Sequence, residues 1–342
     1  VPFVLGLIFL QLHGWTGHGL LDLRRFYGAA NHELAFLLVF AVAIAVTSIP
    51  VISRILFDLG VLETPFARIV LGAAVIEDIM LYVVVAIAIG MVGGQHGEIA
   101  GLQQLLGLDP HSGYATLYHL LVPLVFVGLS LLFGPYLFRK VARFRYNLLA
   151  KSSPIAFLLV FMLLVTGVCV FLGVTPMFGA FVAGMIVGTH AGKRSERSRE
   201  AIKSFAFAFF VPVYFAIVGL KLDLIHAFEP LFFLLFLVFA CGAKSISVYG
   251  GARWAGENRQ GAWNLAVAMN ARGGPGIVLA SVAYDARVIG ESFYVTLVML
   301  AIVTSLAAGS WLERIIAQGK PLRGSDPKEL PHDPVLEGAE SG

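Results

Sequence analysis

Four charged residues lie inside long apolar stretches of this sequence. Glu77 and Asp78 are adjacent in the middle of the stretch 66–92, and Lys244 and Arg272 lie in two later stretches. A charge at the centre of a bilayer costs at least about 2.5–3.5 kcal/mol, so such residues are normally paired or line a water-filled pathway. Neighbouring residues on a helix project about 100° apart, so one lysine cannot readily neutralise both carboxylates. One carboxylate is therefore left to bind something else.

A carboxylate in this setting can exchange a proton for a metal ion. Removal from water favours the protonated form, whereas the hard oxygen atoms of the deprotonated form suit Na⁺ or K⁺. The sequence offers no soft-metal cluster of Cys and His, and Cys169 and Cys241 lie in apolar runs, as expected of packing thiols. The alternative is that two buried ion pairs simply hold helices together. We predict ion exchange, with no catalytic residue and no cofactor besides the transported H⁺ and Na⁺ or K⁺.

Two of the apolar stretches contain groups that interrupt a helix. The stretch 34–57 contains Thr47-Ser48-Ile49-Pro50, and Pro50 has no N–H with which to continue the helix. The stretch 262–282 contains the sequence Asn-Ala-Arg-Gly-Gly-Pro-Gly at 270–276, with breakers Gly273, Gly274 and Pro275. Non-helical backbone at membrane depth must be buried or must line a water cavity, and a broken helix in each half of a transporter indicates its binding site.

Carbonyl groups at the broken helix ends could bind a cation, and Arg272 could neutralise the negative ends that face it. The alternatives are an ordinary kink at Pro50 and a surface loop at 273–276. A phosphate-binding loop is a poor interpretation, because no Gly-Lys-Ser/Thr sequence follows the glycines.

The composition places these residues in a membrane protein. The chain has 342 residues, is 58% hydrophobic and only 13% charged, and has a mean hydropathy of +0.85, whereas soluble domains contain about 25% charged residues. A spanning helix needs about 20 apolar residues. We predict an all-α polytopic membrane protein, with 1–12 as the end of a helix that starts before residue 1. The predicted spanning stretches are 34–57, 66–92, 115–138, 154–172, 176–190, 205–220, 230–252, 262–282 and 292–312.

Basic residues crowd alternate loops, which predicts the orientation. They occur at 54–68, 139–151, 193–203, 253–259 and 314–328, whereas the opposite loops hold only Arg24, Arg25, Lys221 and Arg287. Loops rich in Lys and Arg stay in the cytoplasm. We therefore expect an integral protein of a bacterial cytoplasmic membrane with its C-terminus inside.

The ordered set of motifs resembles the monovalent cation:proton antiporters. The similarity is to the branch with bacterial sodium/proton antiporters, glutathione-gated potassium-efflux proteins and plant cation/proton exchangers. The matching segments are 47–56, Arg68, Glu77-Asp78, 175–184, 218–223 and Arg272-Gly273, which together cover most of 34–312.

This resemblance implies an inverted-repeat antiporter fold with two crossed discontinuous helices. A core (transport) domain, formed by 1–92 and 224–315, would move against a dimerisation domain that lies with a linker helix in 93–223. Residues 316–342 are predicted to be a disordered cytoplasmic tail. The implied partners are the lipid bilayer and a second copy of the chain, and not nucleic acid.

The resemblance also implies roles for individual residues. Asp78 matches the family's ion- and proton-binding carboxylate, which would bind Na⁺ or K⁺ transiently, and Glu77 matches the position before it. Lys244 matches the lysine that pairs with that preceding carboxylate. Thr47, Ser48 and Arg272 match the two crossing points, with Thr47 or Ser48 oxygens expected to help bind the cation.

Two positions depart from the family's pattern. Glu at position 77 is unusual, although it keeps the charge that Lys244 would need. Gly274 stands where the family commonly has Glu, which changes the charge balance at the second crossing.

Other functions remain as alternatives. A cation channel would use the same oxygens but needs a continuous pore, and a sodium-coupled solute transporter would need an organic substrate. A non-transporting membrane sensor is a further alternative. No Gly-x-Ser-x-Gly, His-Glu-x-x-His or Gly-x-Gly-Asp signature supports a membrane enzyme.

Overall fold

The computed structural model describes residues 2–4, 6, 23–92, 102–106, 113–144, 147–189 and 193–323. Within these ranges the chain is helical, apart from connecting segments and one isolated antiparallel bridge between Tyr27 and Ile289. The elements are η1 (Leu23–Phe26), α2 (Glu33–Ala45), α3 (Ile49–Asp58), α4 (Pro65–Val92), α5 (Leu102–Leu105), α6 (Gly113–Ala142), α7 (Leu148–Ser152), α8 (Pro154–Phe171), α9 (Pro176–Gly188), α10 (Lys193–Phe205), the π-helix η3 (Ala206–Phe210), α11 (Val211–Leu220), α12 (Pro230–Trp254), α13 (Arg259–Ala268), α14 (Gly273–Asp285) and α15 (Glu291–Ala317).

Each predicted spanning stretch corresponds to a helix or to a pair of helices. Seven units among the described residues are long and apolar enough to cross a membrane, the first of them formed by α2 and α3 together. The pair α13 and α14, bent by 41°, forms an eighth, and α9 is a shorter apolar helix. The prediction of an all-α polytopic membrane protein is confirmed.

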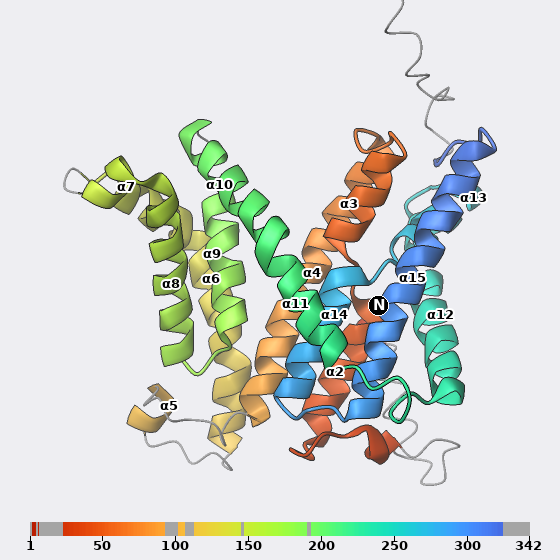
Figure 1. Cartoon of the computed structure of the whole chain (residues 1–342), viewed down its shortest axis with the longest axis horizontal. Helices are drawn as coiled ribbons and strands as arrows, with labels where there is room; N and C mark the ends of the chain where they lie inside the picture. Colours follow the sequence, from red (N-terminus) through yellow and green to blue (C-terminus); the bar gives the residue numbers. More distant parts are fainter. Residues whose placement is uncertain are drawn as a thin grey trace, which may run out of the picture.

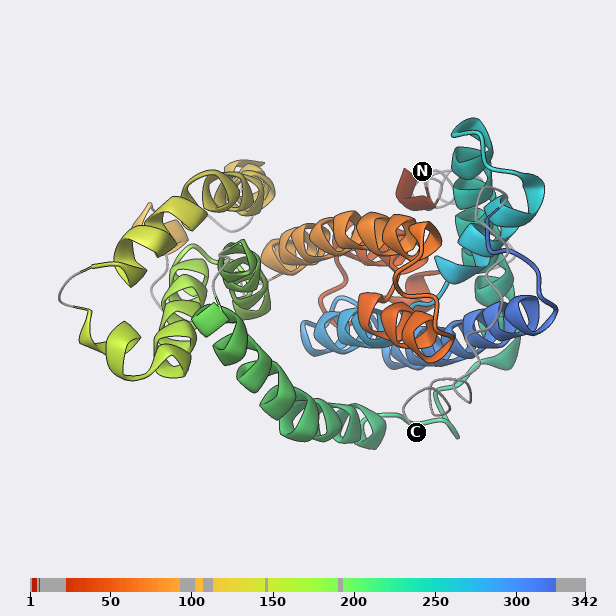
Figure 2. The ribbon, with the colours of Figure 1, turned by 90° about the horizontal axis from the view of Figure 1, so that it is seen from above.

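The helices pack in two groups joined by a long diagonal helix. α6, α8 and α9 lie together on one side in Figure 1, and α2, α3 and α12–α15 lie on the other. α4 contributes to the apolar cores of both groups, and α10, η3 and α11 run between the groups along one side in the view from above (Figure 2). The predicted division into core and dimerisation domains stays a prediction, and this packing is compatible with it.

The basic segments lie at one end of the bundle. The end of α3, the helix α7 and the beginnings of α10 and α13 are all at the top in Figure 1. The alternation of basic and neutral loops in the sequence therefore corresponds to two opposite ends of the molecule.

Two segments are more ordered than the sequence suggested. The basic stretch 193–203, interpreted as a loop, forms α10, which continues through η3 into the apolar α11. The predicted disordered tail does not begin at 316: α15 continues to Ala317, Leu322 is buried, and Arg323 forms an ion pair with Glu257. Both errors arose because hydropathy locates the apolar part of a helix and not its polar ends. Residues 324–342 lie outside the described part of the chain.

Both predicted interruptions are present, each with a local cause. α2 ends at Ala45, residues 46–48 are extended, and α3 begins with Ser48 as its N-cap and Pro50 in its first turn. Pro275 likewise lies in the first turn of α14, where its missing N–H costs no helical hydrogen bond. The prolines therefore start the second half of each broken helix, and the freed carbonyl groups belong to the half that precedes them.

Candidate functional site

The two interruptions are hydrogen-bonded to each other. The Ser48 N–H donates to the Ala271 carbonyl at 2.6 Å, and the Thr47 hydroxyl donates to the Met269 carbonyl at 2.6 Å. Both Thr47 and Ser48 are fully buried. The extended segment between α2 and α3 thus pairs with the segment between α13 and α14, and we call this contact the helix crossing.

Gly273 allows the close approach at the helix crossing. Its φ is +36°, in a region that side chains disfavour, and an added Cβ would clash with Val51 and Ser48. The neighbouring Gly274 is different, because an added Cβ there would meet only the ring of Phe215, at 3.9 Å. Of the three predicted breakers in this segment, Gly273 is the one whose lack of a side chain the packing requires.

Arg272 binds the end of the opposing half-helix. Its guanidinium donates to the carbonyls of Ala43 and Ile44, each at 3.2 Å, and to that of Ala240 at 3.0 Å. The last carbonyls of a helix carry partial negative charge and have no partner inside the helix. The buried Arg272 offsets that charge at the end of α2, as the sequence interpretation proposed.

Lys244 uses all three of its N–H donors at the same place. It comes from α12 with no exposed surface, and its Nζ donates to Ala45 O, to Thr47 Oγ1 at 2.8 Å and to Glu77 Oε2 at 2.8 Å. The pairing with Glu77 that the resemblance implied is therefore present. An ammonium group has three donors, so Lys244 has none left for a second carboxylate.

Asp78 is left without such a partner. It follows Glu77 on α4, and its Oδ1 atom is buried and forms no hydrogen bond with any described residue. Buried polar atoms are nearly always hydrogen-bonded, and a buried oxygen without a partner requires an explanation. A carboxylate oxygen in this state can bind a proton or a metal cation. This is the arrangement expected from the adjacent acidic pair.

Thr47 and Ser48 are already engaged in the helix crossing. The Thr47 hydroxyl donates to Met269 and accepts from Lys244, and the Ser48 hydroxyl accepts the Val51 N–H at 3.3 Å as the N-cap of α3. A hydroxyl oxygen has two lone pairs, so each has one that these bonds do not use. Their contact with a cation stays a prediction.

The site also contains polar residues that the sequence analysis gave no role. The Asn270 side chain accepts from Arg272 at 3.2 Å and donates to Ser245 Oγ at 2.9 Å. Ser305 on α15 accepts the Gly273 N–H at 3.0 Å. Small polar residues in the middle of apolar helices were the signal that could have found Ser245 and Ser305.

The described ranges contain no group of three or more His, Cys, Asp or Glu residues that could hold a metal ion.

The chain is similar to proteins of a known family. Residues 1–318 match the family model described as sodium/hydrogen exchanger, transmembrane. A Na⁺/H⁺ antiporter of Enterococcus hirae is 26% identical over 89% of this chain and 73% of its own length, and the Na⁺/H⁺ antiporter NhaS4 of a Synechocystis species is 26% identical over 82% and 66%. The K⁺/H⁺ antiporter 1 of Saccharomyces cerevisiae is 30% identical over 79% of this chain, which spans only 30% of the yeast protein.

Proposed function

The chain belongs to the sodium/hydrogen exchanger family, and we propose on that premise that it exchanges protons for Na⁺ or K⁺ at the carboxylate of Asp78. The observation that carries the assignment is the contrast between two adjacent acids. Glu77 has the ammonium of Lys244, whereas Asp78 Oδ1 is buried without a partner among the described residues.

Competition at one carboxylate is sufficient to couple the two ions. A bare charge in the middle of the membrane is costly, so the site moves cheaply only when a proton or a metal ion has neutralised Asp78. Because each ion lowers the affinity of the site for the other by occupying it, a gradient of one drives movement of the other. The Thr47 hydroxyl contacts Lys244 of the ion pair, and the oxygens of Thr47 and the adjacent Ser48 are the first candidates for further ligands.

The helix crossing gives this carboxylate a stable setting. Lys244 and Arg272 together bind the last three carbonyls of α2, those of residues 43–45. The broken helices are therefore held to α12 and to each other, and we propose that they move as one body against α6, α8 and α9, which would form the contact with a second copy of the chain. The end with the basic loops would face the cytoplasm.

Lys244 can set the charge that is moved in each cycle. If a cation at Asp78 draws Glu77 away, the ammonium loses one of its three partners and can release a proton, which would make the exchange electrogenic. Lys244→Ala should then weaken the dependence of transport on membrane potential, measured in vesicles with a potassium diffusion potential. An unchanged dependence would remove Lys244 from the charge movement.

The direct test is Asp78→Asn in the full-length protein, reconstituted in vesicles with a trapped pH dye. Additions of Na⁺, K⁺ and Li⁺ in turn should move protons in the wild type and not in the variant, because the amide binds neither ion as a carboxylate does. Asp58→Asn is the matched control, since Asp58 forms an exposed ion pair with Arg54 at the end of α3. Wild-type exchange in Asp78→Asn would refute the assignment.

A further inference from the structure

A second site lies at the far end of α13 from the helix crossing. Residues of α12, α13, α15 and the segment after α15 surround an open cavity of about 920 Å³. Tyr249, Trp263 and Trp311 provide aromatic walls, and the rings of Tyr249 and Trp263 lie 5.3 Å apart. None of the residues that line this cavity is acidic.

Hydrogen bonds hold the walls of the cavity in place. The fully buried Asn264 accepts the Trp311 indole N–H at 3.1 Å and donates to the Leu322 carbonyl at 3.0 Å. Arg323 Nε donates to Glu257 at 2.6 Å, which fixes the segment after α15 against the connection between α12 and α13. The cavity is therefore a built feature of the fold, and Lys320 is carried on a segment that is tied at both ends.

The cavity contains cationic groups that have no acidic partner. The side chains of Arg259 and Lys320 form no hydrogen bond or ion pair within the described part of the chain, whereas the nearby Arg323 is paired with Glu257. Gln260 adds a neutral amide beside them. Two unpaired cations with an amide suit a phosphate group, which is an anion with several acceptor oxygens.

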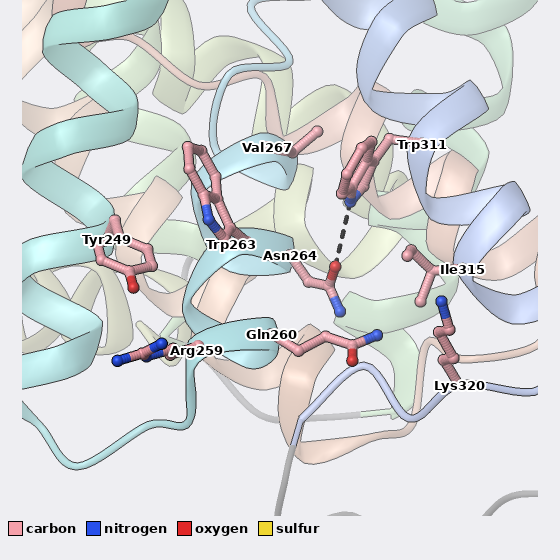
Figure 3. Close-up of a pocket in the computed structure, with 9 residues that line it drawn as sticks. All are labelled: Tyr249, Arg259, Gln260, Trp263, Asn264, Val267, Trp311, Ile315 and Lys320. Carbon is pink, nitrogen blue, oxygen red and sulfur yellow. Dashed lines mark hydrogen bonds between the residues drawn. The ribbon is translucent and has the colours of Figure 1, made fainter.

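Polarity changes from one end of the cavity to the other. Figure 3 shows Arg259 and Lys320 on opposite sides of one end with Gln260 between them, Val267 at the opposite end, and the rings of Trp263 and Trp311 along the two sides. Trp263 and Trp311 are 51% and 41% exposed, so an occupant would contact both rings. An occupant that fits has an anionic head and an apolar body.

The depth of the cavity identifies the source of such a molecule. α13 begins and α15 ends at the end of the bundle that carries the basic loops (Figure 1). Tryptophan, tyrosine and basic residues mark the level of the lipid headgroups, and basic pockets between helices at this level bind anionic lipid headgroups. We propose that this cavity binds one anionic phospholipid, with its headgroup at the end that carries Arg259, Gln260 and Lys320 and an acyl chain along Trp263 and Val267.

The two tryptophans allow the site to be observed directly. In the full chain with Trp15→Phe and Trp254→Phe, the remaining fluorescence comes from Trp263 and Trp311. This protein would be reconstituted in two sets of phosphatidylcholine vesicles. One set contains a small fraction of dibrominated phosphatidylglycerol, and the other contains the same fraction of dibrominated phosphatidylcholine. Bromine quenches the fluorescence of an indole that it contacts. The proposal expects stronger quenching by the phosphatidylglycerol.

Removal of either cation should weaken this preference. Each charge near the surface is worth about 1 kcal/mol toward anionic lipid, so Arg259→Gln or Lys320→Gln should weaken the preference for phosphatidylglycerol about fivefold. Arg314→Gln is the matched control, because Arg314 lies exposed on α15 and does not line the cavity. It removes the same charge from the same end of the molecule and should leave the preference unchanged.

Three outcomes would overturn the proposal. Equal quenching by the two lipids would show that the cavity has no preference for an anionic headgroup. An equal effect of Arg314→Gln would show a general attraction of the surface and no site. Loss of the preference on addition of inorganic phosphate, at an ionic strength matched with chloride, would show that the cations bind a soluble phosphate group instead of a lipid.

Discussion

The ion pair between Lys244 and Glu77 makes a prediction that a double-mutant cycle can test. Lys244 has no exposed surface and donates to three acceptors, while the Glu77 side chain is 23% exposed. Glu77→Gln leaves a fully buried ammonium without its anionic partner, which should lower the free energy of unfolding by about 3–5 kcal/mol. Lys244→Met should cost less, about 1–3 kcal/mol, because a carboxylate that reaches the surface can bind water or a proton.

The double variant should be more stable than the sum of the two losses predicts. Once both charges are gone, neither substitution leaves the other member of the ion pair unpaired, although the carbonyl of Ala45 and the hydroxyl of Thr47 still lack their donor. Residues in direct contact typically show coupling of about 0.5–3 kcal/mol, and the complete burial of Lys244 places this pair in the upper part of that range. Reversible unfolding in mixed micelles, followed as the fraction of a denaturing detergent rises, gives the four free energies.

A surface pair supplies the control for this cycle. Arg25 and Glu229 are 3.0 Å apart but remain 46% and 35% exposed, so their coupling should lie within about 0.2–1 kcal/mol. The corresponding substitutions in this pair, Arg25→Met and Glu229→Gln, measure its coupling free energy. If the coupling of Lys244 and Glu77 is no larger than that of this surface pair, the buried ion pair does not hold α12 to α4 and the account of the site is wrong.

Three further predictions concern the glycines, the α11–α12 connection and the aromatic cavity. Gly273→Ala should lower the thermal unfolding midpoint, because the added side chain introduces about 1–3 kcal/mol of strain. Gly274→Ala should leave the midpoint unchanged or raise it, because alanine favours a helix by up to about 1 kcal/mol relative to glycine. Equal effects of the two substitutions would contradict the packing described at the helix crossing. Hydrogen bonds from the backbone and ring of His226 lower the pKa of the exposed Asp223. The stabilisation that these bonds provide is therefore present above the ordinary pKa of aspartate and is lost as the pH falls through the lowered value. His226→Ala should raise the pKa of Asp223 in a carboxyl NMR titration, and an unchanged pKa would exclude the ring contact as a cause. Trp311→Phe removes a donor from a buried asparagine and should cost about 1–3 kcal/mol in unfolding free energy; full stability would show that the indole bond does not hold the cavity wall.

Much of the fold could be predicted from the sequence because the membrane imposes simple requirements. Apolar length located each span, and Pro50 and the glycines at 273 and 274 located the two interruptions. What could not be predicted was the polar structure at the helix ends. The charged residues of α10 and the packed segment before residue 324 have no apolar signature, so hydropathy could not separate them from loops.

The sequence singled out the charged residues that the structure brings together, but apart from the pair of Lys244 with Glu77 it did not predict their hydrogen bonds. The rarity of charge in apolar helices singles out Glu77, Asp78, Lys244 and Arg272 without any structure. The partner of each depends on where α12 lies relative to α4, which is set by tertiary packing. The hydrogen bond from Thr47 to Met269 spans 222 residues of sequence, and no local pattern encodes it.

The structure also accounts for the missing acid at the second helix crossing. Gly274 occupies the position where similar antiporters commonly carry Glu, and the sequence alone left Arg272 without an evident counter-charge. In the structure the Arg272 guanidinium donates to four backbone carbonyls, two of them at the negative end of α2, and to the Asn270 side chain. The C-terminal end of a helix carries roughly half a negative elementary charge. Lys244 also binds this end of α2, through the carbonyl of Ala45. The partial charge of the backbone thus takes the place of a side-chain anion, and the charge balance of the site then depends on whether Asp78 is occupied.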